Sequence, residues 1–117
     1  MPIVQVVYER GFKFGKVAKK LANVLPGIIA PQISTSTGIL SKKTIKVHVR
    51  KSSKRDVHVE GFQILIFVDA SPERMASMEE RKNAIIKGIQ EFLGKYDCDI
   101  SGFIWILPVP ETALGVF

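Results

Sequence analysis

The sequence predicts an α/β fold of two layers, in which two consecutive βαβ units form a four-stranded sheet with two helices on one face. Two observations carry this prediction. Segments typical of strands occur four times along the chain, and a segment with helical spacing of apolar residues separates each pair of them. The 117 residues suit a single domain, residues 1–117, with repeat units of roughly 1–56 and 57–117.

The first unit begins with a strand over residues 2–8 (PIVQVVY), which is rich in β-branched side chains. Apolar residues then recur at helical spacing over residues 14–25, with lysines on the opposite side, and predict an amphipathic helix. We expect Pro26 to end this helix, because proline removes a backbone donor, and residues 27–43 to form mostly loop. Residues 44–50 (TIKVHVR) alternate apolar and polar side chains, which predicts a half-exposed strand.

The strands of the second unit are more apolar than those of the first. Residues 62–68 (FQILIFV) predict a buried strand, which we extend backward through Val57 and Val59. Residues 102–107 (GFIWIL) predict a last strand that is apolar on both faces.

A helix is expected between these two strands. Ser71 is placed to be its N-cap, Pro72 its first helical residue, and Gly94 the residue that ends it. Its buried side is expected to carry Met75, Met78, Ile85, Ile89, Phe92 and Leu93.

The order of elements fits two architectures. Each helix can be a right-handed crossover between parallel strands, which gives two βαβ units side by side. The alternative is a ferredoxin-like sandwich, which often serves as a binding module. The pairing direction of the strands distinguishes them, since the ferredoxin-like sheet is antiparallel.

The charge of the chain is unevenly distributed and indicates an anionic partner. Residues 1–59 hold 12 basic and 2 acidic side chains, whereas residues 60–117 hold 5 basic and 9 acidic ones. The basic run over residues 42–55 lacks interleaved aromatic residues for base stacking, so nucleic acid is not an expected partner. A solvated hairpin or a contact between copies explains this run better.

Cysteine and histidine usage narrows the class of protein. Cys98 is the single cysteine, so no intrachain disulfide forms, and the start of the chain is unlike a signal peptide. The longest apolar run, Ile64 to Val68, is too short to span a bilayer, so we expect a cytoplasmic protein without a membrane partner. His48 and His58 lack partners at metal-ligand spacing, and we predict no metal site.

Several short motifs resemble the tautomerase superfamily. The start, Met1-Pro2-Ile3-Val4-Gln5-Val6, is similar to that of the oxalocrotonate tautomerase branch, and Gly11 is in step with its glycine after the first strand. Later parts of the chain also resemble the family: Ser71-Pro72-Glu73 resembles a helix opening, and residues 109–115 resemble its closing segment. The length is similar to the double-unit members, such as macrophage migration inhibitory factor and carboxymethyl-hydroxymuconate isomerase.

The resemblance implies a cofactor-independent keto-enol tautomerase or isomerase acting on a small α-keto or enol carboxylic acid. Removal of Met1 would expose Pro2 as a secondary amine. In the family that the sequence resembles, this terminal proline acts as the general base. Lys46, which falls at a family arginine position, would bind the substrate carboxylate together with Arg10 or Lys13. Phe103 and Trp105 would form a pocket wall, and the chain would assemble as a homotrimer with sites between subunits.

Two alternatives stay open at this point. One is a ferredoxin-like basic module that binds RNA or another polyanion. The other is a protein with the tautomerase fold that has lost catalytic activity and retains a ligand-binding or structural role.

Overall fold

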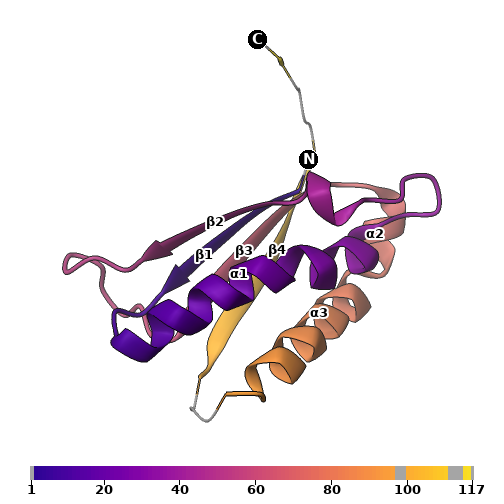
Figure 1. Ribbon diagram of the computed structural model, residues 1–117. Coiled ribbons are helices and arrows are strands. Elements are labelled where there is room, and N and C mark those ends of the chain that lie inside the picture. The colour runs from indigo at the N-terminus through magenta and orange to yellow at the C-terminus, as the bar shows by residue number, and fades with distance from the viewer. Residues whose placement is uncertain (1, 97–99, 111–114, 117) are drawn as a thin grey trace.

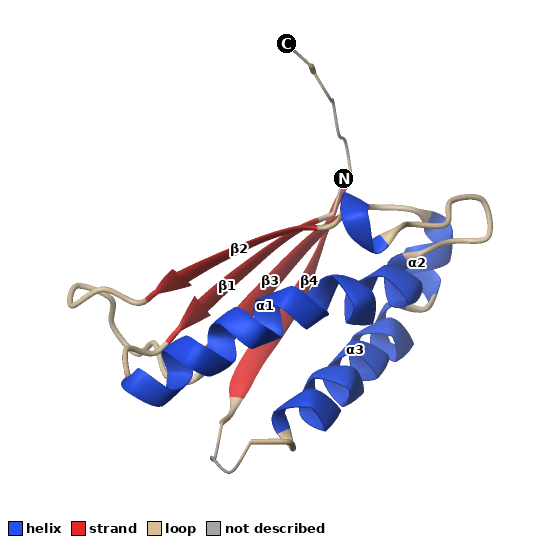
Figure 2. Ribbon diagram, viewed as in Figure 1, coloured by secondary structure: helices blue, strands red, loops and turns tan. Residues whose placement is uncertain are grey.

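All four strands lie in one mixed sheet, and the helices cover a single face of it (Figures 1 and 2). The computed structural model describes residues 2–96, 100–110 and 115–116, without the side chains of residues 12 and 13. The strand order is β2-β1-β3-β4, so the first strands of both units are central and the last strands are the edges. The predicted fold class is therefore confirmed.

The first unit contains a strand, a long helix, a 3₁₀ turn and a second strand. These are β1 (Ile3–Tyr8), α1 (Phe12–Ile33), η1 (Lys42–Thr44) and β2 (Lys46–Lys51). β2 runs parallel to β1, with Lys46 paired to Ile3 and Lys51 to Tyr8. The helix is thus a crossover between parallel neighbours.

The second unit repeats this plan. It contains β3 (Phe62–Asp69), α2 (Pro72–Ala76), α3 (Met78–Leu93) and β4 (Gly102–Val109). β4 runs parallel to β3, and β3 joins the first unit by antiparallel pairing with β1. Both units are parallel within themselves, which excludes the ferredoxin-like alternative and leaves the side-by-side arrangement.

The hydrophobic core lies between the sheet and α1, with α3 at its side. The core contains alternate residues of β1 and β3, the inner stripe of α1 and two residues of α3. Where the helices cross, a Cβ on Gly88 would lie 2.8 Å from Cγ2 of Ile28, so the missing side chain lets α3 approach α1. The largest fully buried side chains are Leu21, Leu25, Ile29, Ile33, Ile66, Ile85, Val4, Val6 and Val68.

The first helix is longer than predicted, because it continues through Pro26 and Pro31 to Ile33. The prediction that Pro26 ends the helix is wrong, and residues 27–33 of the predicted loop belong to α1, whereas residues 34–41 are loop as predicted. Ile29 and Ile33, beyond that proline, are completely or almost completely buried. Burial of these side chains outweighs the lost backbone hydrogen bonds, which cost about 3 kcal/mol per internal proline.

The second helix is shorter than predicted, because it breaks at Ser77 into α2 and α3. Ser71 is the predicted N-cap, and its hydroxyl accepts a hydrogen bond from the Arg74 amide at 3.2 Å. Met75 lies on the short helix α2 and is 53% exposed, so its predicted burial is wrong. The other predicted members of the buried side are at least half-buried, and Gly94 ends α3 as predicted.

Strand ends differ from the predictions in two places. Val57 and Val59 do not extend β3, because they belong to the connection between the units, where Val57 is 73% exposed. Residue 44 belongs to η1, and β2 begins only at Lys46. Among the described residues, none of the helices combines the length and hydrophobicity needed to cross a membrane.

Candidate active site

Pro2 lies directly before the central strand β1, and it is buried. Its carbonyl oxygen accepts a hydrogen bond from the backbone N–H of Lys46 at 3.2 Å. The start of β1 therefore lies beside the start of β2, and the structure brings Pro2 and Lys46 together. Figure 1 shows this end of the sheet next to η1 and the C-terminal part of α1.

Lys46 is exposed on the face of the sheet that no described helix covers, which we call the open face. Val4 and Val6 point to the helices, so their alternate neighbours Ile3 and Gln5 belong to the open face. The parallel register gives β2 the same alternation, and its open-face residues are all basic or imidazole side chains: Lys46, His48 and Arg50.

Asp69 ends β3 at the same end of the sheet as Pro2. In β3 the buried residues Phe62, Ile64, Ile66 and Val68 alternate with half-buried ones, and Asp69 belongs to the half-buried, open-face set. β1 and β3 pair Ile3 with Phe67, so continuing the antiparallel ladder sets Pro2 opposite Val68 and Asp69 one residue further. Sequence reasoning missed this residue. The sequence does contain a signal for it, because Asp69 is a carboxylate at the end of an otherwise apolar strand.

Arg10 lies beyond the other end of β1, so the structure does not bring it to Pro2 within one chain. A strand rises about 3.3 Å per residue, which separates the two ends of the six-residue β1 by about 20 Å. Arg10 borders a polar hollow of about 330 Å³, together with Glu9, Asp56 and His58. Lys13 belongs to the first turn of α1 at this same end, but its side chain lies outside the described part.

Phe103 and Trp105 project from the edge strand β4 on the open face, in register with Gln63 and Leu65 of β3. They are 64% and 52% exposed, and their rings stack with centroids 6.4 Å apart and an interplanar angle of 12°. Their ring stack therefore lies on the same face as Lys46, with the two central strands between them.

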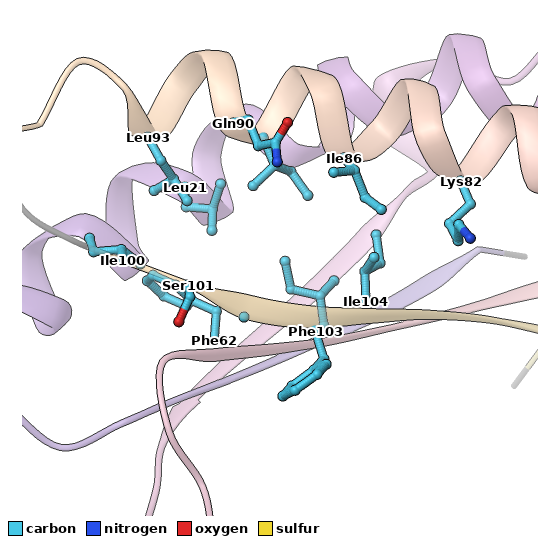
Figure 3. A pocket seen from close by; sticks show the side chains of 13 residues that line it. Leu21, Phe62, Lys82, Ile86, Gln90, Leu93, Ile100, Ser101, Phe103 and Ile104 are labelled. Atoms are coloured by element: carbon cyan, nitrogen blue, oxygen red, sulfur yellow. The ribbon is translucent and has the colours of Figure 1, made fainter.

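The opposite face of β4 borders an apolar cleft of about 440 Å³ beneath α3 (Figure 3). Ile104 points into this cleft, whereas the ring of Phe103 points away from it. Lys82 stands at the cleft and forms an ion pair with Glu79 one turn earlier. Because the sheet separates this cleft from Lys46, it is not part of the region around Pro2.

In the described ranges, no group of three or more His, Cys, Asp and Glu side chains has a geometry that could hold a metal ion. Cys98, the single cysteine of the sequence, lies outside the described residues. Of the candidate residues, Pro2, Lys46 and Asp69 lie at the same end of the sheet.

Comparison with protein-family models gives no match, and comparison with curated protein sequences gives none either. Solved structures do match over almost the whole chain. Malonate semialdehyde decarboxylase is similar with a TM-score of 0.67 at 12% identity, covering 97% of this chain and 91% of that one. A protein inactivated by 2-oxo-3-pentynoate is similar with a TM-score of 0.65 at 13% identity. A fused 4-OT that forms an asymmetric trimer is similar with a TM-score of 0.62 at 15% identity. Both matches cover 97% of this chain and 91% of the other.

These similar structures are members of the tautomerase superfamily. The resemblance indicated by the N-terminal residues is thus confirmed for the fold: the chain has the tautomerase-superfamily fold over nearly its full length.

Proposed function

We propose that this protein is a small isomerase of the tautomerase type, which acts without a cofactor on an α-keto or enol carboxylic acid. The observation that supports it most directly is the position of Pro2, buried at the start of the central strand of this fold and hydrogen-bonded to Lys46. The structural neighbours of the fold are enzymes. A cytoplasmic location is part of the proposal.

The mechanism requires that Met1 is removed, because only then is the Pro2 nitrogen a secondary amine instead of an amide. Such an amine can take a proton from oxygen or carbon as a general base and return it to another atom of the substrate. Lys46, beside it on β2, would bind the substrate carboxylate and stabilise the enolate charge that develops during the transfer. Proton return restores the amine, so the reaction is a net isomerisation.

The test begins with the N-terminus. Intact-mass spectrometry reports whether Met1 is absent, and a phenylpyruvate ketonisation assay follows on the same sample. We expect Pro2→Ala to lower the rate about 100-fold or more, since positioned proton transfer contributes at least about that factor. Pro72→Ala, at the exposed start of α2, is the matched control and should keep full activity. Retained Met1, or unchanged activity in Pro2→Ala, contradicts the proposal.

A covalent probe identifies the amine independently of the substrate. One structural neighbour is inactivated by 2-oxo-3-pentynoate. We expect the same compound to modify this protein once, at Pro2, as peptide mass mapping would report. Modification only at lysine side chains would argue against a reactive amine at Pro2.

Lys46 is tested by its effect on substrate binding. A hydrogen bond to a charged group contributes about 1.5–3 kcal/mol, so Lys46→Ala should raise KM about tenfold or more. His48→Ala changes the next open-face residue of β2 and serves as the control, with no expected change in KM. An equal change in KM in the two variants would mean that Lys46 has no specific role in substrate binding.

We further propose that the chain assembles as a homotrimer with sites between subunits. Fused 4-OT neighbours are trimers, and the open face here exposes Phe103, Trp105 and Leu107. Sedimentation should give three times the chain mass of 13.0 kDa. Trp105 is the single tryptophan, so its emission should shift to longer wavelength when dilution separates the subunits. A monomer at micromolar concentration contradicts this assembly.

A neighbouring subunit would also supply a second basic group to Pro2, in addition to Lys46 of its own chain. Arg10 lies at the far end of β1, so it would act on the Pro2 of another copy. Pro2→Ala and Arg10→Ala should each be inactive alone, whereas a refolded mixture should regain part of the activity. If Arg10 acted within its own chain, mixing would restore nothing.

A second candidate function is binding of single-stranded nucleic acid on the open face. The basic run alone lacks aromatic partners, but the fold brings the stacked Phe103 and Trp105 onto the same face as Lys46 and Arg50. Fluorescence polarisation with a labelled oligonucleotide tests it. Affinity should fall steeply with salt and should drop in Trp105→Ala. No binding at low salt removes this candidate.

A further inference from the structure

The second unit leaves part of its apolar surface uncovered, in the cleft of about 440 Å³ between α3 and β4 (Figure 3). The lining includes two buried side chains, Leu21 and Phe62, and apolar side chains that stay only half-buried: Ile86, Leu93 and Ile104. Small-molecule sites are typically clefts of about 300–1,000 Å³ with a mainly apolar lining. Such a lining offers water few hydrogen-bond partners, so an apolar ligand gains free energy by displacing it.

The cleft is elongated along α3. Lys82, Ile86, Ile89 and Leu93 line it at spacings of three or four residues, so they share one face of the helix. From residue 82 to residue 93 the helix rises about 16 Å, at about 1.5 Å per residue. Figure 3 shows Lys82 at one end of the cleft and Leu93 at the other. The cleft therefore fits a long, narrow ligand.

Lys82 is the one charged side chain among the described residues that line the cleft. It is 32% exposed, whereas its ion-pair partner Glu79 is 76% exposed and is not part of the lining. An exposed ion pair within one helical turn contributes little to stability and is weakened by salt. A ligand anion in the cleft can therefore replace Glu79 at the Lys82 ammonium, while the Glu79 carboxylate stays in water.

We propose that this cleft is a second binding site, which takes a free carboxylic acid with an unbranched hydrocarbon chain. The ligand carboxylate lies at Lys82, and its chain runs beneath α3 toward Leu93. A carbon–carbon bond of about 1.5 Å advances an extended chain by about 1.3 Å, so about twelve carbons match the cleft. One ammonium group balances one negative charge, which favours a carboxylate over a phosphate dianion.

The proposed ligand differs from the substrate of the proposed isomerase in both length and place. The sheet separates the cleft from Lys46, and the ring of Phe103 on the open face points away from it. Binding in the cleft therefore does not require the Pro2 amine. The chain of the ligand would cover the half-buried side chains of the second unit, so binding should raise the thermal melting temperature as the ligand concentration rises.

Titration calorimetry on the full chain tests the length of the ligand. Hexanoate, octanoate, decanoate and dodecanoate are used below their micelle concentrations. We expect one molecule to bind per chain, with an affinity that rises by up to about fourfold for each added methylene group. Tetradecanoate should bind no more tightly than dodecanoate, because the cleft is then full. No saturable binding, or several molecules per chain without a limit in length, overturns the proposal.

Variants of α3 and β4 test the place and the charge. Lys82→Met removes the ammonium group but keeps a long side chain, so the affinity for dodecanoate should fall about tenfold or more. Lys87→Met is the matched control, since Lys87 is exposed on α3 and is not part of the lining. Equal losses in the two variants overturn the role of Lys82. Ile104→Trp places a large ring in the cleft and should abolish binding, and an unchanged affinity there overturns the location.

A measurement on the unaltered protein does not depend on the folding of any variant. In isoleucine-methyl NMR, the dodecanoate chain should give nuclear Overhauser effects to Ile86 and Ile104, and none to Ile45 in the first unit. Effects at the Trp105 ring instead would place the ligand on the open face and overturn the proposal. Pro2→Ala should bind dodecanoate as wild type does, so this site and the proposed isomerase activity are tested separately.

Discussion

The first βαβ unit covers its strands with one unbroken helix of 22 residues, whereas the second uses a helix that breaks at Ser77. α1 buries a continuous stripe from Val17 to Ile33 against the sheet. α3 buries only Ile85 and Ile89, and an apolar cleft remains between it and β4. The same topology thus gives a tightly packed first unit and a looser second one.

The edge strands of the two units also differ. The open face of β2 carries Lys46, His48 and Arg50, and that of β4 carries Phe103, Trp105 and Leu107. Across the open face, the surface changes from cationic to apolar over four strands. The equivalent edge strands of the two units therefore differ in chemistry, one cationic and the other aromatic and apolar.

The largest expected effect contrasts the packing of α1 and α3. Ile29 of α1 is completely buried, so Ile29→Ala should lower the free energy of unfolding by about 3 kcal/mol. Ile86 of α3 is half-buried at the cleft, and Ile86→Ala should cost only about 1 kcal/mol. Urea unfolding measures both. Equal losses would mean that the second unit is packed as tightly as the first.

The next contrast concerns two glycines. A Cβ on Gly102 would lie 2.3 Å from the carbonyl oxygen of Phe62, so Gly102→Ala should destabilise the β3–β4 pair by about 2–3 kcal/mol. Gly27 in α1 has open space at its Cβ, and Gly27→Ala should stabilise the protein by up to about 1 kcal/mol. Thermal unfolding of the two variants should shift in opposite directions. A shift of both in the same direction would contradict this contrast.

Arg81 ties the second unit to the first. Its guanidinium donates hydrogen bonds of 2.8 Å to the carbonyls of Gln32 and Ser34, where α1 ends without basic residues of its own. Arg81→Ala should cost about 2 kcal/mol, because it leaves these carbonyls without their charged donor. Arg81→Lys should recover only part of this, since lysine has no second nitrogen to donate to the Ser77 hydroxyl, as Nε of Arg81 does at 2.7 Å. Full recovery would indicate a simple charge effect.

The smallest expected effect concerns the length of α1. Pro26 removes a backbone hydrogen bond from the helix interior, so Pro26→Ala should raise the free energy of unfolding by about 1 kcal/mol after the greater freedom of the unfolded chain is subtracted. Hydrogen exchange of residues 27–33 should slow in this variant. A loss of stability would mean that the proline ring packs better than an alanine would.

Local sequence signals located the strands because their side-chain alternation reflects the two faces of a sheet. They also identified Ser71 as an N-cap and Gly94 as a helix end, since both depend on neighbouring residues only. They failed at Pro26, where the burial of Ile29 and Ile33 overrides a local helix-ending signal. Asp69 was missed for a related reason, because its position beside Pro2 depends on antiparallel pairing between residues 67 apart in the chain.

The sequence by itself determined the two βαβ units, the excess of basic residues in the first and the terminal Met1-Pro2 motif. Only the tertiary structure decided that β1 and β3 pair antiparallel at the centre of the sheet. That pairing sets Asp69 at the same end of the sheet as Pro2 and places the charged residues of β2 and the aromatic residues of β4 on one face. The physical reason is that periodicity encodes which face of a strand is buried, whereas strand order follows from packing between segments distant in the chain.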